Sequence, residues 1–78
     1  MNITTTLVHN DNGTPKVVAK GAGKQRTINY DHGFSHERNY GNAAGTLAAV
    51  FGWQADDNIT HEFVSGRKHV FTNHDFII

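Results

Sequence analysis

One segment of the chain, residues 36–51, has the pattern of an amphipathic α-helix with recognisable ends. Ser35 can cap its N-terminus through the hydroxyl, and Glu37 suits the positive end of the helix dipole. Gly52 stands where a left-handed residue commonly ends a helix. At about 100° per residue, the apolar side chains that we expect to be buried share one face: Tyr40, Ala44, Leu47 and Phe51, flanked by Ala43 and Val50. Because no other segment has a credible helical pattern, strands must supply the rest of the core.

The part of the chain before the helix has the pattern of three strands. Asn12-Gly13 separates the first two, and this pair readily adopts the positive φ angles of a type I′ hairpin turn. With these two residues at the tip, Leu7 lies opposite Val18. Residues 24–31 resume the strand pattern after a glycine-rich break, so a third strand is expected there.

A second hairpin is predicted after the helix. With Gly66-Arg67 as a type II′ turn, Phe63 faces Val70, which pairs two large apolar side chains. The predicted element order is therefore β-β-β-α-β-β. We expect a single α+β domain over residues 1–78, in which one helix packs on an antiparallel sheet of four or five strands.

Small residues recur along the predicted helix beside its apolar face, at Gly41, Gly45 and Ala49. Each glycine in a helix interior costs about 1 kcal/mol relative to alanine, so a compensating interaction is expected. Close packing of the helix on the sheet of the same chain is the favoured explanation, and a partner's backbone is the alternative.

Seven basic and seven acidic side chains give a formal net charge of zero. This balance argues against a protein that coats nucleic acid or imitates it, since both depend on a strong field of one sign. Basic residues nevertheless gather in an acid-free stretch: Lys16, Lys20, Lys24 and Arg26. Such a basic edge could contact phosphates, but no aromatic residue alternates with it to stack bases.

Residues 30–42 hold a dense group of polar and aromatic side chains between the third strand and the helix. We interpret these as a strand-to-helix junction held by polar side chains, namely Tyr30, Asp31, His32, Ser35 and Asn39. A buried tyrosine at position 30 or 40 needs a partner for its hydroxyl, and Asn39, His32 or Arg38 could serve.

Two chemical hypotheses compete with this interpretation. His32 and His36 have the spacing of a helical metal pair, but the Ser35 cap lies between them, so the rings should not share a face. Tyr30, Asp31 and His32 could form an acid–base set, but neighbouring strand residues point to opposite faces. A zinc ion could still combine the first pair with a distant histidine, at position 61, 69 or 74. We predict no catalytic residue, no metal and no cofactor, and therefore not an enzyme.

The two ends of the sequence lead to further expectations. The start lacks the basic and apolar stretches of a signal peptide, and no apolar run reaches the roughly 18 residues of a membrane span. We expect a cytoplasmic protein without a membrane segment. The last residues of the sequence are large and apolar, so we expect them to be buried against the sheet or against another chain. We therefore expect a homodimer that uses its open sheet face or this segment, with these candidate interface residues: Phe71, Phe76, Ile77 and Ile78.

The middle of the chain carries a resemblance. GKQRT at 23–27, YDH at 30–32 and NAAGTL at 42–47, together with Ser35, Asn39 and Gly41, resemble a run found in small uncharacterised proteins of actinobacterial phages, including mycobacteriophages. The resemblance implies a phage product that acts in the cytoplasm of a bacterial host, and it brings no catalytic role. We expect a non-catalytic module that binds a host protein. Nucleic-acid binding through the basic edge at residues 16–26 is the alternative.

Overall fold

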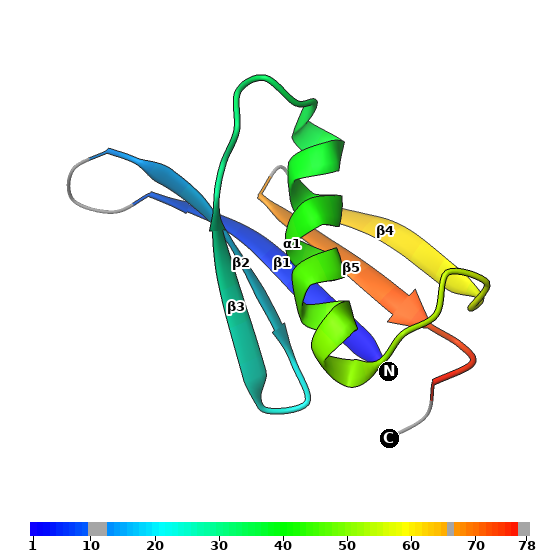
Figure 1. Cartoon of the computed structure of the whole chain (residues 1–78). Coiled ribbons are helices and arrows are strands. Elements are labelled where there is room, and N and C mark those ends of the chain that lie inside the picture. The colour runs from blue at the N-terminus through cyan, green and yellow to red at the C-terminus, as the bar shows by residue number, and fades with distance from the viewer. Residues whose placement is uncertain (10–12, 66, 77–78) are drawn as a thin grey trace.

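The computed structural model describes residues 1–9, 13–65 and 67–76. The predicted α+β class and the element order β-β-β-α-β-β are confirmed (Figure 1). The strands form one antiparallel sheet of five strands in the order β3-β2-β1-β5-β4, so β3 and β4 are its edges. The elements have these bounds: β1 Asn2–His9, β2 Pro15–Gly21, β3 Lys24–Asn29, α1 His36–Phe51, β4 Ile59–Ser65 and β5 Lys68–Asn73.

Helix α1 begins and ends where its capping residues predict. The Ser35 hydroxyl accepts a hydrogen bond from the Arg38 amide at 3.1 Å. Gly52 adopts the left-handed conformation at φ 82°, and the Trp53 amide then donates to the Ala48 carbonyl at 3.1 Å. These bonds satisfy backbone groups that the helix itself leaves without partners.

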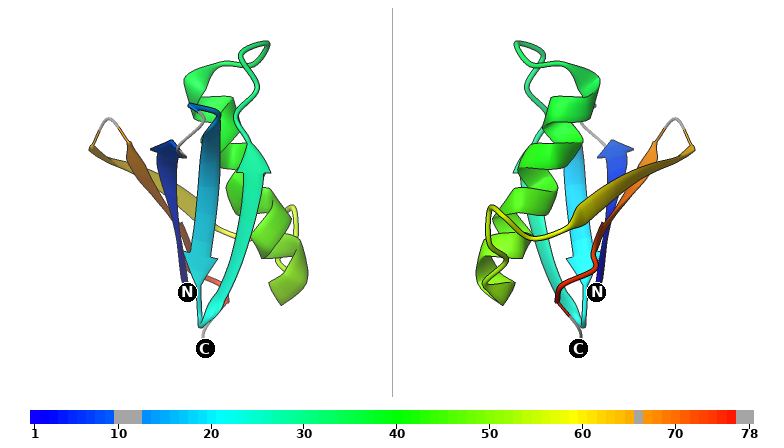
Figure 2. Two further views of the ribbon diagram at one scale, coloured as in Figure 1. Left: turned by 90° about the vertical axis from the view of Figure 1, so that its left-hand side faces the viewer. Right: turned by 90° about the vertical axis from the view of Figure 1, so that its right-hand side faces the viewer.

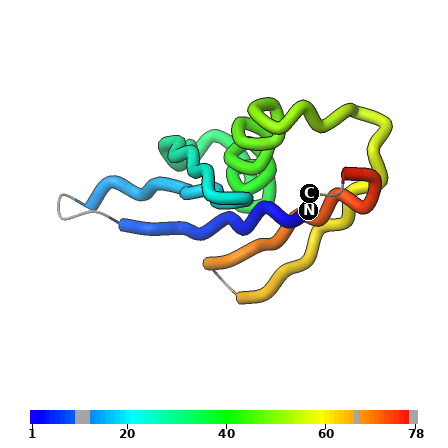
Figure 3. The backbone as a smooth tube through the Cα atoms, turned by 90° about the horizontal axis from the view of Figure 1, so that it is seen from below, coloured from blue at the N-terminus to red at the C-terminus, as the bar shows by residue number. Residues whose placement is uncertain are grey.

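The helix covers only part of the sheet. It lies across β1, β2 and β3, while the β4–β5 hairpin turns away from it (Figures 2 and 3). The core forms between these layers, from Ile3, Val17 and Ala19 on the sheet and four helix residues: Tyr40, Ala43, Ala44 and Leu47. We call the face of the sheet that carries Ile3 and Val17 the helix side, and the other face the open side. Val50, expected to flank the buried stripe, is 42% exposed because the helix contacts the sheet through a narrower strip.

The first hairpin has a different register from the predicted one. Leu7 lies opposite Val17, not Val18. The observed pairing puts Ile3, Val17 and Ala19 on the same face, where all three are completely buried. The predicted pairing would have placed Val17 and Ala19 on the face opposite to Ile3. Burial of one shared face therefore outweighs the local preference of Asn12-Gly13, of which Asn12 lies outside the described residues.

The second hairpin has the predicted pairing next to its turn but a different pairing farther along the two strands. Ser65 lies opposite Lys68, as a turn at positions 66 and 67 requires, although Gly66 itself is outside the described residues. A bulge between Phe63 and Ser65 then shifts the pairing by one residue, so that Phe63 faces His69 and not Val70. The shift aligns rings on the helix side, since Phe63 meets His69 edge to face with ring centroids 5.1 Å apart.

Candidate functional site

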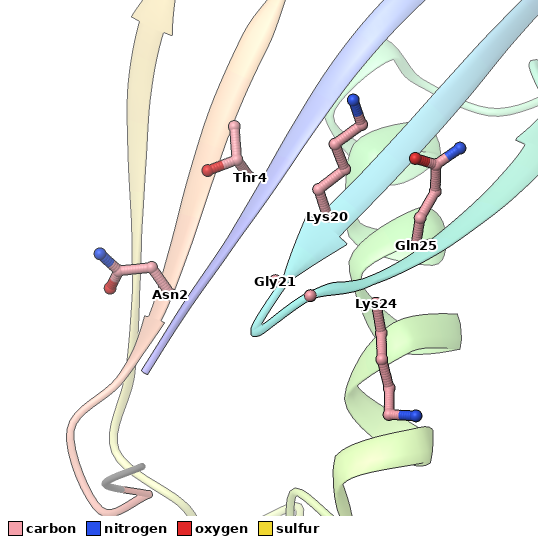
Figure 4. A pocket seen from close by; sticks show the side chains of 7 residues that line it. Asn2, Thr4, Lys20, Gly21, Lys24 and Gln25 are labelled. Atoms are coloured by element: carbon pink, nitrogen blue, oxygen red, sulfur yellow. The ribbon is translucent and has the colours of Figure 1, made fainter.

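The four basic residues predicted to form one edge are divided between the two faces of the sheet. Lys16 and Lys20 lie on the open side of β2, and the Lys16 ammonium donates to the Asn29 side-chain carbonyl at 2.7 Å. Arg26 lies opposite the buried Ala19, on the helix side of β3. Figure 4 shows Lys24 pointing away from Lys20 across the β2–β3 turn. The continuous basic edge is therefore not formed.

Lys68 joins Lys16 and Lys20 on the open side, although it was not among the site residues predicted from the sequence. Lys68 pairs with Thr6, and Thr6 pairs with Val18 between the two β2 lysines. Lys68 reaches the open side beside the β2 lysines only because β1 pairs with β5, which is distant in the sequence. A local sequence pattern does not predict such a long-range pairing. The open side also carries polar residues at neighbouring positions, including Thr4, Gln25 and Asn2 around a broad hollow of about 470 Å³ (Figure 4).

The strand-to-helix junction is held by Asn39, which is 1% exposed. Its side-chain oxygen accepts from the Asp31 amide at 2.7 Å, and its side-chain nitrogen donates to the Asp31 carbonyl at 2.9 Å and the Ser35 carbonyl at 3.0 Å. The Asp31 carboxylate accepts from the Gly33 amide at 2.8 Å, which stabilises the turn. These groups satisfy backbone atoms between the strand and the helix, so their role here is structural.

The tyrosine partners differ from those that we expected. The Tyr30 hydroxyl is hydrogen-bonded to His36 Nδ1 at 3.0 Å, not to Asn39, His32 or Arg38. His32 contacts the Tyr30 ring edge to face, with centroids 5.1 Å apart. The Tyr40 hydroxyl is buried and has no hydrogen-bond partner among the described residues.

A second polar group, unexpected from sequence, centres on His69, which is 2% exposed. Its Nδ1 is hydrogen-bonded to His61 Nε2, and its ring stacks on Tyr40 with centroids 4.1 Å apart. Burial lowers the pKa of His69, the charges of His61 and His36 lower it further, and Glu37 acts in the opposite direction. Burial likewise raises the pKa of Tyr40.

The lowered pKa of His69 predicts that the fold loses stability in mild acid. An unfolded histidine binds a proton at pH values below about 6.5, whereas the folded chain resists protonating His69 until a lower pH. The contribution of His69 to the free energy of unfolding is therefore complete above about pH 6.5, the unfolded value. It is lost as the pH falls toward the lower pKa that His69 has in the folded chain. Denaturant titrations at about pH 7.5 and about pH 5 measure this loss.

Two histidine variants identify the residue that is responsible. We expect the loss of stability between the two pH values to be smaller in His69→Phe than in the wild type, and to be the same in His74→Gln as in the wild type. Equal losses in all three proteins would contradict the assignment.

An apolar groove lies between α1 and the β4–β5 hairpin. This hollow, about 160 Å³ in volume, is lined by seven residues that we call the α1–β4 groove: Gly41, Ala44, Gly45, Ala48, Trp53, Ile59 and Phe71. A Cβ atom added to Gly41 or Gly45 would meet nothing within 4 Å. The predicted packing of the small-residue row on the sheet is therefore wrong, because the hairpin turns away from this part of the helix. Within the described residues, the buried Trp53 Nε1 has no hydrogen-bond partner.

The edge strand β4 is exposed along its whole length. Three of its large apolar side chains are accessible: Ile59 at 41%, Phe63 at 62% and Val64 at 52%. Natural proteins usually protect such an edge with charge, proline or a covering segment. This combination of a free edge and apolar side chains is typical of a surface that meets another chain.

The C-terminal interface candidates take different positions. Phe71 is half-buried on the helix side and stacks on His61 with ring centroids 4.4 Å apart, so it does not belong to the open face. Phe76 is half-buried beside the start of β1, where its carbonyl accepts from the Met1 amino group at 2.9 Å. Ile77 and Ile78 lie outside the described residues. Their part in a dimer stays a prediction.

The described ranges contain no group of three or more histidine, aspartate or glutamate side chains arranged to hold a metal ion. Nor does the described part of the chain include a helix long and apolar enough to cross a bilayer. Comparisons with protein-family models, with curated proteins and with solved structures find no match to this chain. The resemblance to actinobacteriophage proteins therefore stays a prediction.

Proposed function

We propose that the protein is a non-catalytic module that binds a host protein through the α1–β4 groove, as a phage product in the bacterial cytoplasm. The observation that carries this proposal is the open space above Gly41 and Gly45 within an apolar hollow. Interior helix glycines cost about 1 kcal/mol each, and no close approach within the described chain compensates for that cost. A partner that approaches the helix backbone would supply the compensation.

The groove also defines the chemistry of its partner. Its lining is almost entirely apolar, so it favours an aliphatic or aromatic side chain. An apolar side chain presented on an extended or helical segment of the partner fits this lining.

Two substitutions at Gly45 separate folding from binding. Gly45→Ala should raise the free energy of unfolding by about 0.5–1 kcal/mol, because alanine costs less helical entropy and its Cβ has open space. Gly45→Arg should also keep the fold but block the groove. Ala49→Arg is the matched control, because Ala49 is exposed on the same helix and does not line the groove.

The readout is capture of a host protein from an actinobacterial lysate, alongside denaturant titration of each variant. We expect the same captured protein with the wild type and Ala49→Arg, and none with Gly45→Arg. Equal capture by Gly45→Arg and the wild type would exclude the groove as the binding surface. A loss of stability in Gly45→Ala would show that the glycine has a role within the fold.

Nucleic-acid binding is the second candidate, favoured by the three lysines that share the open side: Lys16, Lys20 and Lys68. Glu62 lies opposite Val70 on the same side, so its negative charge weakens the positive field of the lysines. The net charge of the whole chain is zero, which weakens long-range attraction to nucleic acid as well. A gel-shift assay with DNA and RNA at two salt concentrations tests this function. Binding that falls steeply with salt and disappears in the triple alanine variant would place nucleic acid ahead of a protein partner.

A further inference from the structure

The free edge of β4 presents backbone groups in a defined pattern. The His74 amide donates to the Asn58 carbonyl at 2.8 Å, so the backbone groups of Asn58 point toward β5. Because backbone groups alternate along an antiparallel strand, those of Ile59, His61 and Phe63 point outward from the sheet. The edge therefore offers donors and acceptors on alternate residues that have no partner within the described part of the chain, up to the bulge that follows Phe63.

The side chains of this edge are complementary to a second copy of the same strand. An antiparallel pairing about a two-fold axis at His61 sets Ile59 opposite Phe63 of the second copy, which joins two exposed apolar side chains. On the open side it sets Glu62 opposite Thr60 of the second copy, which avoids opposing like charges. An axis at Glu62 would instead bring two carboxylates face to face, which is unfavourable.

Other properties of the chain permit this pairing. The net charge is zero, so two copies do not repel each other at long range. Helix α1 lies over β1, β2 and β3 and leaves the β4 edge uncovered (Figures 2 and 3). We propose that the protein forms a homodimer by antiparallel pairing of β4 with β4 of a second copy, centred on His61. The sheets of the two copies then join into one continuous sheet. This interface is not the C-terminal or open-face dimer expected from the sequence.

A single introduced cysteine tests the pairing, because the chain has no cysteine of its own. Residues in a hydrogen-bonded antiparallel pair have Cα atoms about 5.5 Å apart, which suits a disulfide. Under mild oxidation, His61→Cys should form a covalent dimer that reductant reverses. Thr60→Cys should remain monomeric under denaturing conditions. Residue 60 of one copy lies opposite Glu62 of the second copy, so the two introduced cysteines are offset by two residues along the paired strands. Lys20→Cys, away from this edge, measures crosslinking by random collision. Crosslinking of His61→Cys no faster than of Lys20→Cys would overturn the proposal, as would preferential crosslinking of Thr60→Cys.

Light scattering at micromolar concentration gives the second readout. The wild type should have the mass of two chains, and Phe63→Lys should have the mass of one, because it replaces an apolar contact of the pair with a charge. A monomeric wild type, or a Phe63→Lys variant that stays dimeric, would also overturn the proposal. Phe63 does not line the α1–β4 groove, so Phe63→Lys should still capture the host partner. Failure of the dimer and failure of the groove are therefore distinguishable.

Discussion

Replacing Leu47 with alanine is expected to lower the free energy of unfolding by about 2–5 kcal/mol, since Leu47 is fully buried between α1 and the sheet. The loss has two parts. The removed carbon atoms no longer contribute the free energy of burying apolar surface, and a cavity remains in the core cluster that includes Ile3 and Val17. A denaturant titration measures it, provided that the slope with denaturant stays constant. Val50→Ala, on the same helix but 42% exposed, should cost less than about 1 kcal/mol. Equal losses in the two variants would remove Leu47 from the core.

Replacing Asn39 with alanine should be destabilising by about 1–3 kcal/mol, although it removes little apolar surface. The Asp31 amide, the Asp31 carbonyl and the Ser35 carbonyl all bond to this one amide side chain in a partly buried position. Without it, the three backbone groups lose their partner where water has limited access.

Asn42→Ala is the matched control for Asn39, because Asn42 is an exposed asparagine on the same helix. It should change the free energy of unfolding by no more than about 0.5 kcal/mol. Amide hydrogen exchange provides an independent measurement, since the Asp31 amide should exchange faster in Asn39→Ala. An unchanged exchange rate would show that Asn39 does not hold the junction.

The two proposed surfaces are compatible within one assembly. A two-fold axis perpendicular to the sheet at His61 keeps both α1 helices on the same side of the joined sheet. Each copy would then present its α1–β4 groove on that side, beside the shared edge. A dimer that binds two identical partner segments would gain avidity from this arrangement.

Local signals in the sequence were sufficient to identify the elements. The Ser35 cap and the left-handed Gly52 delimit the helix at residues 36–51, because each satisfies backbone groups that a helix end leaves unpaired. The apolar periodicity likewise identified Tyr40, Ala44 and Leu47 as core residues. These properties depend on interactions within a few residues, so a short stretch of sequence contains the information that determines them.

Register and site geometry depended on contacts between distant residues. The Asn12-Gly13 pair favours a tight turn, yet the shared burial of Ile3, Val17 and Ala19 selects a pairing shifted by one residue. The bulge after Phe63 similarly shifts the pairing of β4 with β5 by one residue, and no local sequence signal predicted it.

The sequence by itself thus determined the fold class, the element order, and the start and end of the helix. Only the tertiary structure decided which residues share a face. It divided the basic residues between two sides of the sheet, enclosed His69, and left Gly41 and Gly45 beside an open groove. The physical reason is that strand pairing and helix position depend on burying apolar side chains from distant parts of the chain together, and local propensities contribute only part of that free energy.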